Sequence, residues 1–392
     1  MKRPILVAVL ASLAALTAAT PAAAAKRQVP FGFMGVLADA HVLDPARVNL
    51  GDEMKEMSRT GVESVRAAFY WSSAQPYASF ADVPPEEASR FRHEVNGVPT
   101  DFIESDYLVG NAAERGFTVL PVVVVSPNWA AEHPGTPGSP PYGPEPYAAY
   151  LTGLVERYGP DGEFWREHPE IPKVPVREWQ LWNEPNSMWF WSDQPFAAEY
   201  VDLLKGGYRA VKAADPGARV VLAGLVKESW NLLDLVYRAG GKKFFDVVAI
   251  HPFTEKPENV MRILGLVRRT MRKYGDNNKR MFVSELTWPS SKGKIEGKYG
   301  YETTEAGQAS RLRTTYRMLA ANRRRLRLDR VYWVTWLKAD KSPTDQFDYS
   351  GLRRIERDSD IVAKPAQRAY AQTARILEGC TKSSHARQCR AP

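Results

Sequence analysis

The sequence predicts an α/β protein folded as a single (β/α)8 barrel, also called a TIM barrel. From Phe31 onward, short runs rich in β-branched and aromatic residues alternate with longer segments of helical periodicity. This alternation is typical of parallel strands joined by helical crossovers. Eight such runs occur, which is the number that closes the barrel. A length of 392 residues would also allow two domains, but no linker, low-complexity tract or internal repeat divides the chain.

The eight predicted strands lie between Phe31 and Trp336. They are Phe31–Leu37, Ser64–Tyr70, Thr118–Val125, Glu178–Trp182, Arg219–Leu225, Phe245–Ile250, Arg280–Glu285 and Arg330–Trp336. Segments long enough to carry a return helix are Pro84–Arg115, Tyr147–Tyr158, Ala197–Ala214, Asn231–Ala239, Pro257–Tyr274 and Thr304–Arg323. The Pro/Gly-rich segment Pro134–Pro146 is predicted to be a loop after the third strand, and Lys364–Leu377 a final helix.

The first 25 residues have the features of a secretory signal peptide. Lys2 and Arg3 precede an apolar run from residue 5 to residue 20, and Pro21 and four alanines follow it. The run is shorter than the roughly 20 residues that span a bilayer, so an uncleaved anchor is the less favoured alternative. We therefore expect residues 1–25 to be removed and the protein to be secreted or extracytoplasmic. We expect no membrane insertion after cleavage, since no second run of that length follows.

The two cysteines, Cys380 and Cys389, lie in a polar C-terminal stretch (CTKSSHARQC). We expect residues 26–378 to form the barrel domain and residues 379–392 a tail outside it. In an exported protein, two such cysteines are expected to form one disulfide. The alternative, a metal site with His385, is disfavoured because no further ligands cluster nearby.

Composition and charge exclude several functions. The net charge of +8 is modest, and no basic stretch is interleaved with aromatic residues, so we expect no nucleic-acid partner. The six histidines occur singly and no Gly-rich phosphate loop is present, so we expect neither a metal nor a cofactor. We expect a monomer.

Two glutamates stand at the ends of predicted strands. The fourth strand runs REWQLWNEPN and ends at Asn183 and Glu184, and the seventh runs RMFVSELTWP and ends at Glu285. The carboxyl ends of barrel strands carry the active sites of such enzymes, so both carboxylates should face one mouth. Carboxylate pairs at that position can cleave glycosidic bonds by double displacement. For either glutamate alone, a helix cap or a structural ion pair would be the commoner role.

Aromatic residues frame both glutamates. Trp182 precedes Asn183, residues 189–191 (Trp-Phe-Trp) follow in the next loop, and Trp288 follows Glu285. Flat apolar sugar faces pack against such rings while the indole N–H can bond a hydroxyl. At least half of the 11 tryptophans are nevertheless expected to serve packing alone.

These motifs resemble those of retaining glycoside hydrolases of clan A, the superfamily that includes family 5 cellulases and family 39 xylosidases and iduronidases. The resemblance is strongest at WNEP, residues 182–185, and implies that Glu184 is the general acid/base and that Asn183 bonds the sugar 2-hydroxyl. The SE of VSELTW implies that Glu285 is the nucleophile. Arg66 in SVRAAFYW is similar to the arginine that supports the nucleophile. Trp336 in YWVTWLKADK is similar to the tryptophan that lies under the sugar at subsite −1.

The sequence also departs from the clan pattern. The sixth strand ends in IHPF, so Phe253 stands where many members have a tyrosine that touches the nucleophile. His251 is expected to orient a substrate hydroxyl or the acid/base, with a packed structural histidine as the alternative. The third strand, VVVVSPNWA, is closer to the family 39 pattern than to that of family 5, which makes Trp129 and Asn128 candidate substrate-binding residues.

The expected protein is thus a secreted retaining O-glycosyl hydrolase that acts on a poly- or oligosaccharide, with substrate-binding residues Arg66, Asn183, His251, Trp129, Trp288 and Trp336. Two alternatives use the same barrel. One is a transglycosylase that excludes water from the acceptor site, and the other is a noncatalytic carbohydrate-binding protein.

Overall fold

The computed structural model describes residues 26–297, 299–357 and 360–380. The predicted signal peptide and Cys389 of the predicted disulfide lie outside these residues. Within them, no helix is long and apolar enough to cross a membrane.

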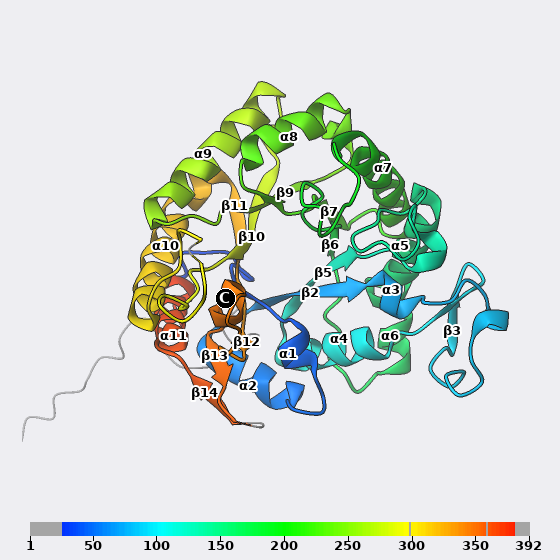
Figure 1. Ribbon diagram of the computed structural model, residues 1–392, viewed down its shortest axis with the longest axis horizontal. Helices are drawn as coiled ribbons and strands as arrows, with labels where there is room; N and C mark the ends of the chain where they lie inside the picture. Colours follow the sequence, from blue (N-terminus) through cyan, green and yellow to red (C-terminus); the bar gives the residue numbers. More distant parts are fainter. Residues whose placement is uncertain (1–25, 298, 358–359, 381–392) are drawn as a thin grey trace, which may run out of the picture.

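Eight parallel strands form a closed barrel, which confirms the predicted fold (Figure 1). The strand order is β10-β11-β1-β2-β5-β6-β7-β9, and β9 pairs with β10 to close the ring. The barrel strands are β1 (Met34–Leu37), β2 (Ser64–Tyr70), β5 (Thr118–Val124), β6 (Glu178–Leu181), β7 (Arg219–Val221), β9 (Val247–His251), β10 (Arg280–Leu286) and β11 (Leu328–Trp333). A short strand, β8 (Leu225–Val226), continues beside the end of β9.

Long helices surround the barrel, and each follows one barrel strand (Figure 1). They are α2 (Leu50–Thr60), α4 (Ile103–Arg115), α5 (Pro144–Tyr158), α7 (Ala197–Ala214), α8 (Ser229–Arg238), α9 (Pro257–Lys273), α10 (Glu305–Leu326) and α11 (Pro365–Glu378). Shorter helices are α1 (Ala40–Leu43), α3 (Trp71–Ala74) and α6 (Glu163–Glu167).

Local sequence signals set the helix ends. The Asn49 side chain accepts from the backbone N–H of Asp52 at the start of α2, and Thr304 caps α10 in the same way. Gly61 and Gly116 end α2 and α4 in the left-handed conformation that glycine adopts without strain. The chain therefore turns back toward the next strand at defined residues.

Three features differ from the sequence-based expectation. The segment Pro84–Arg115 carries the return helix for which it is long enough, α4, but an unpredicted hairpin of β3 (His93–Val95) and β4 (Val98–Thr100) around Asn96 and Gly97 precedes that helix. The eighth barrel strand ends at Trp333 rather than Trp336. The chain then forms a small sheet of β12 (Leu337–Lys338), β13 (Arg353–Ile355) and β14 (Ile361–Ala363).

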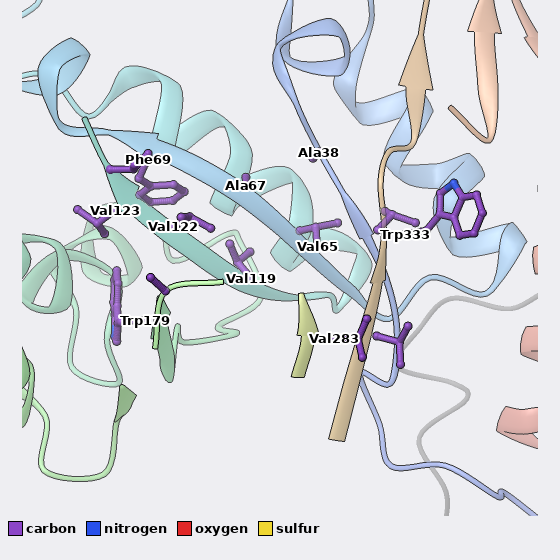
Figure 2. Close-up of a cluster of buried hydrophobic side chains, with 14 of the residues drawn as sticks. Ala38, Val65, Ala67, Phe69, Val119, Val122, Val123, Trp179, Val283 and Trp333 are labelled. Carbon is purple, nitrogen blue, oxygen red and sulfur yellow. The ribbon is translucent and has the colours of Figure 1, made fainter. Parts of the chain in front are cut away.

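The hydrophobic core has two parts. The larger part lies between the strands and the helices, and Figure 2 shows Val65, Val119, Trp179 and Val283 within it. A smaller cluster fills the inside of the ring with Leu120, Val221, Val247, Ala249, Phe282 and Tyr332. The buried ion pair between Arg330 Nε and Glu178 Oε2, 2.6 Å apart, also lies within the ring of strands. A packed interior leaves the carboxyl ends of the strands as the place for polar side chains.

Candidate active site

Five of the predicted site residues meet at one end of the barrel. Arg66 lies on β2, Asn183 and Glu184 follow β6, His251 ends β9, and Glu285 is on β10. All five are linked by hydrogen bonds or close polar contacts. Parallel strands bring them together because their carboxyl ends share one mouth.

Arg66 connects three of its neighbours. Its Nη1 donates to Glu285 Oε1 at 2.8 Å, its Nη2 to Asn183 Oδ1 at 2.8 Å and its Nε to Gln180 Oε1 at 2.9 Å. The guanidinium is almost fully buried, so its charge-assisted hydrogen bond to Glu285 lies in a low-dielectric setting. Because the Asn183 amide oxygen accepts from Arg66, the amide NH2 is the group that can donate to a ligand.

His251 lies between the two glutamates. Its Nδ1 is 2.6 Å from Glu184 Oε1, and its Nε2 is 3.6 Å from Glu285 Oε1. Burial lowers the pKa of His251 to about 4, although the negative charge of Glu285 partly opposes this. A neutral imidazole has a single N–H, so His251 can donate to only one of the two carboxylates at a time.

The two carboxylates are close but differ in environment. One oxygen of Glu184 lies within 4.8 Å of one oxygen of Glu285. Burial raises the pKa of Glu184 to about 7, against the positive charges of Arg66 and Lys227. Glu285 instead accepts directly from Arg66. The site therefore holds one carboxyl group that retains its proton near neutral pH and one that is paired with a cation.

The backbone around Glu184 is strained and firmly held. Trp182 and Glu184 have φ values of 72° and 39°, a region that residues other than glycine rarely occupy. The Trp182 indole donates to the carbonyl of Phe190 at 2.6 Å, and the Glu184 N–H donates to the carbonyl of Gly224 at 3.1 Å. Such conformations persist where the surroundings fix them, and they cluster at functional sites.

Gly224 is a site residue that sequence reasoning missed. A Cβ atom at this position would lie 2.0 Å from His251 Nε2, so only glycine leaves room for the imidazole. Gly224 also bridges to Asn183 between strand ends. The sequence feature that could have indicated Gly224 is its position after the fifth barrel strand, one residue before β8.

A pocket of about 170 Å³ opens beside Glu285, and we call it the catalytic pocket. Arg66, Asn183 and Glu285 line it, together with Phe190 of the aromatic run after the fourth strand and three residues that the sequence did not indicate: Asp39, Tyr70 and Glu104. Asp39 Oδ2 pairs with Lys338 Nζ at 2.7 Å, while Asp39 Oδ1 is buried and has no hydrogen-bond partner among the described residues. That oxygen can accept a bond from a bound hydroxyl group.

The three predicted tryptophans lie elsewhere. Trp336 is fully buried, and its indole donates to Glu53 Oε2 on α2 at 2.7 Å, so the predicted platform beneath the sugar is corrected to a packing role. Trp288 is also fully buried and donates to the carbonyl of Thr254. Trp129 is half-buried, packs edge-on against Trp71 and donates to the carbonyl of Gln75. None of the three lines the catalytic pocket.

Two groups of described residues bring possible metal-ligand atoms within 4.8 Å of one another: Glu184, His251 and Glu285, and also His93, Glu163 and Glu167. In each group, an arginine side chain already contacts one or more of the carboxylates. Arg66 bonds Glu285, and Arg157 lies 3.5 Å from Glu163 and 3.1 Å from Glu167. A metal cation would have to compete with these buried positive charges.

Comparison with solved structures finds the same barrel in known enzymes. A family 39 glycoside hydrolase from Bacteroides cellulosilyticus WH2 superposes with a TM-score of 0.62 and 19% identity, over 89% of this chain and 64% of that one. A monomeric beta-xylosidase from Caulobacter crescentus CB15 has a TM-score of 0.60 and 16% identity, over 88% and 69%. The GH53 catalytic domain from Ignisphaera aggregans has a TM-score of 0.55 and 20% identity, over 89% and 97%.

This chain shares the barrel fold of these glycoside hydrolases. It spans less than two thirds of the length of the family 39 enzyme from Bacteroides cellulosilyticus. No protein-family model matches the sequence, and comparison with curated proteins finds no relative.

Proposed function

We propose that this protein is a retaining glycoside hydrolase in which Glu285 is the nucleophile and Glu184 the general acid/base. One observation carries the proposal: the two carboxyl groups approach within 4.8 Å, yet one is desolvated and the other is paired with Arg66. Retaining enzymes hold their carboxyl groups about 5–5.5 Å apart, whereas inverting enzymes need roughly 6.5–9.5 Å to admit a water molecule. The spacing here supports direct attack by a carboxylate.

In the first step, a Glu285 carboxylate oxygen attacks the anomeric carbon as the bond to the leaving oxygen breaks. Glu184 transfers its proton to that oxygen, which departs as an alcohol. The hydrogen bond from Arg66 keeps Glu285 aimed, and Asn183 can donate to a hydroxyl of the sugar. The products of this step are a glycosyl ester on Glu285 and a Glu184 carboxylate.

In the second step, the Glu184 carboxylate accepts a proton from water as the water oxygen attacks the anomeric carbon. The ester bond breaks, Glu285 regains its negative charge and Glu184 its proton. His251 is neutral and bonded to Glu184. Its single N–H can donate to Glu184 while that group is charged, which helps Glu184 to change from acid to base.

The proposal includes a carbohydrate substrate and a location outside the cytoplasm. The glycosidase names of proteins with this barrel support the first, together with a pocket that combines aromatic side chains with polar groups. The signal-like segment at residues 1–25 supports the second.

The test is hydrolysis of 4-nitrophenyl β-glycosides of xylose, glucose, mannose and galactose by the purified protein and its variants. We expect wild-type activity with retention of the anomeric configuration in the first-formed product. We expect Glu285→Gln to lose about 10³-fold or more in kcat, because the nucleophile is removed. We expect azide to restore turnover of Glu184→Ala and to yield a glycosyl azide, since azide needs no general base.

Glu258→Gln, which changes an exposed glutamate in the first turn of α9, is the matched control and should retain wild-type activity. Unchanged activity in Glu285→Gln, or an inverted product, would contradict the mechanism.

A further inference from the structure

A second hollow of about 550 Å³ adjoins the catalytic pocket, and we call it the side hollow. The two share four lining residues, Leu43, Ala68, Tyr70 and Glu104, so one opens beside the other at the rim of the barrel. The catalytic pocket alone is smaller than the roughly 300–1,000 Å³ of most small-ligand sites, whereas the side hollow lies within that range. A ligand that is larger than one sugar and occupies the catalytic pocket can extend into the side hollow.

The direction of this extension follows from the roles proposed for the glutamates. Glu285 and Asn183 line the catalytic pocket, but Glu184 does not belong to that lining. The nucleophile attacks the sugar whose glycosidic bond is cleaved, while the acid faces the leaving group. The catalytic pocket is therefore on the glycone side, and the side hollow continues away from the leaving group.

The lining of the side hollow suits a sugar. Tyr70, Ile103 and Tyr107 line it with exposed fractions of 44%, 59% and 41%, although large apolar side chains are normally covered. Tyr150 contributes a buried ring beneath them. Sugar rings present apolar C–H faces to such surfaces.

Polar groups complete the rim of the side hollow. Arg90 and Asp101 form an ion pair of 2.9 Å, and Glu104 stands between the two hollows as a lining residue of both. An apolar floor with a few charged groups at its edge is the usual composition of a small-ligand site, and the charged groups can bond sugar hydroxyls.

We propose, on the basis of the function inferred above, that the glycone of the substrate continues from the catalytic pocket into the side hollow. The protein then binds at least two sugar units on the glycone side, with Tyr70 between the first and the second. It releases a disaccharide or a longer unit from that side rather than single sugars.

The test compares kcat/KM for 4-nitrophenyl β-glycosides of xylose, glucose and mannose with kcat/KM for the glycosides of their β-1,4-linked disaccharides. We expect the disaccharide glycoside of the preferred sugar to be cleaved at least 10-fold more efficiently, with 4-nitrophenol and the intact disaccharide as the first products. Ile103→Trp, which fills the side hollow, should lower the ratio of disaccharide to monosaccharide efficiency by at least 10-fold. Ile376→Trp, at an exposed isoleucine on α11, is the matched control and should leave the ratio unchanged.

The possible outcomes separate this proposal from the proposed function. Activity with equal efficiencies on both glycosides, or an unchanged ratio in Ile103→Trp, overturns the extended glycone site and leaves the glycosidase intact. Monosaccharide release from an unsubstituted hexasaccharide as the first product also overturns it. Absence of activity on every glycoside tested overturns the proposed function, and the extended site with it.

Discussion

The guanidinium of Arg66 joins Glu285 to Asn183, with each of its two terminal nitrogens 2.8 Å from an oxygen of one partner. The third bond, from Nε to Gln180, fixes the plane of the guanidinium. One buried cation thus orients both the proposed nucleophile and the proposed 2-hydroxyl contact. A lysine could not reproduce this arrangement, because its ammonium group is a point charge on a flexible stem.

We therefore predict that Arg66→Lys lowers kcat by about 100-fold or more, even though the positive charge is retained. Steady-state kinetics on the preferred aryl glycoside would measure the loss. Arg47→Lys, at an exposed arginine, is the control and should be neutral. Equal activity of Arg66→Lys and wild type would mean that charge alone suffices and that the bonding geometry does not matter.

The pH dependence of kcat/KM should follow the protonation of Glu184. This group must hold its proton to act as an acid, and its pKa is raised to about 7 by burial. We predict that kcat/KM falls about tenfold per pH unit above pH 7, as the acid form disappears. Because the charge of Lys227 lowers the pKa of Glu184, Lys227→Gln should raise that pKa and move the alkaline limb to higher pH.

Lys55→Gln removes an exposed charge on α2 and serves as the control for this titration. A limb that stays in place in Lys227→Gln, or moves to lower pH, would show that the limb does not belong to Glu184.

Gly224 makes room for the imidazole of His251, since a Cβ there would lie 2.0 Å from Nε2. We predict that Gly224→Ala displaces the ring, breaks its bond to Glu184 and lowers kcat/KM by about 10-fold or more. The matched control is Gly265→Ala in α9, where a Cβ would meet nothing within 4 Å. Alanine at that helical position should keep activity and raise the free energy of unfolding by about 0.5–1 kcal/mol.

Thermal or denaturant unfolding of both variants would separate a local effect on the site from a general loss of stability. A Gly224→Ala protein that keeps full activity would show that the position of His251 is not critical.

Much of this site could be predicted from local sequence. Glu184 and Glu285 stand at strand ends and Arg66 lies within β2, and strands follow from runs of β-branched residues that are read without tertiary information. The Asn96-Gly97 turn of the β3–β4 hairpin was equally readable, because Asn-Gly favours the positive φ values of 53° and 79° found there. The position of Gly224 beside His251 and the side hollow could not be predicted, because each depends on how distant segments pack.

The position of Trp336 was also mispredicted because it depends on how distant segments pack. The sequence places it on the eighth strand, but that strand ends at Trp333 and the indole instead reaches Glu53, a residue 283 positions earlier in the chain. Burial raises the pKa of Glu53, while the charge of Arg353 and the indole N–H lower it. Trp336 thus belongs to a buried network between the barrel and α2.

This network leads to the last prediction, that Trp336→Phe affects stability rather than catalysis. Phenylalanine keeps most of the packing but removes the indole N–H that donates to Glu53, so a buried carboxyl group loses a hydrogen bond. We expect the free energy of unfolding to fall by about 1–3 kcal/mol, measured by denaturant titration. We expect kcat/KM at a temperature well below the transition to change by less than about threefold. A large loss of kcat/KM with unchanged stability would instead show that the ring contacts the sugar, as the sequence resemblance implies.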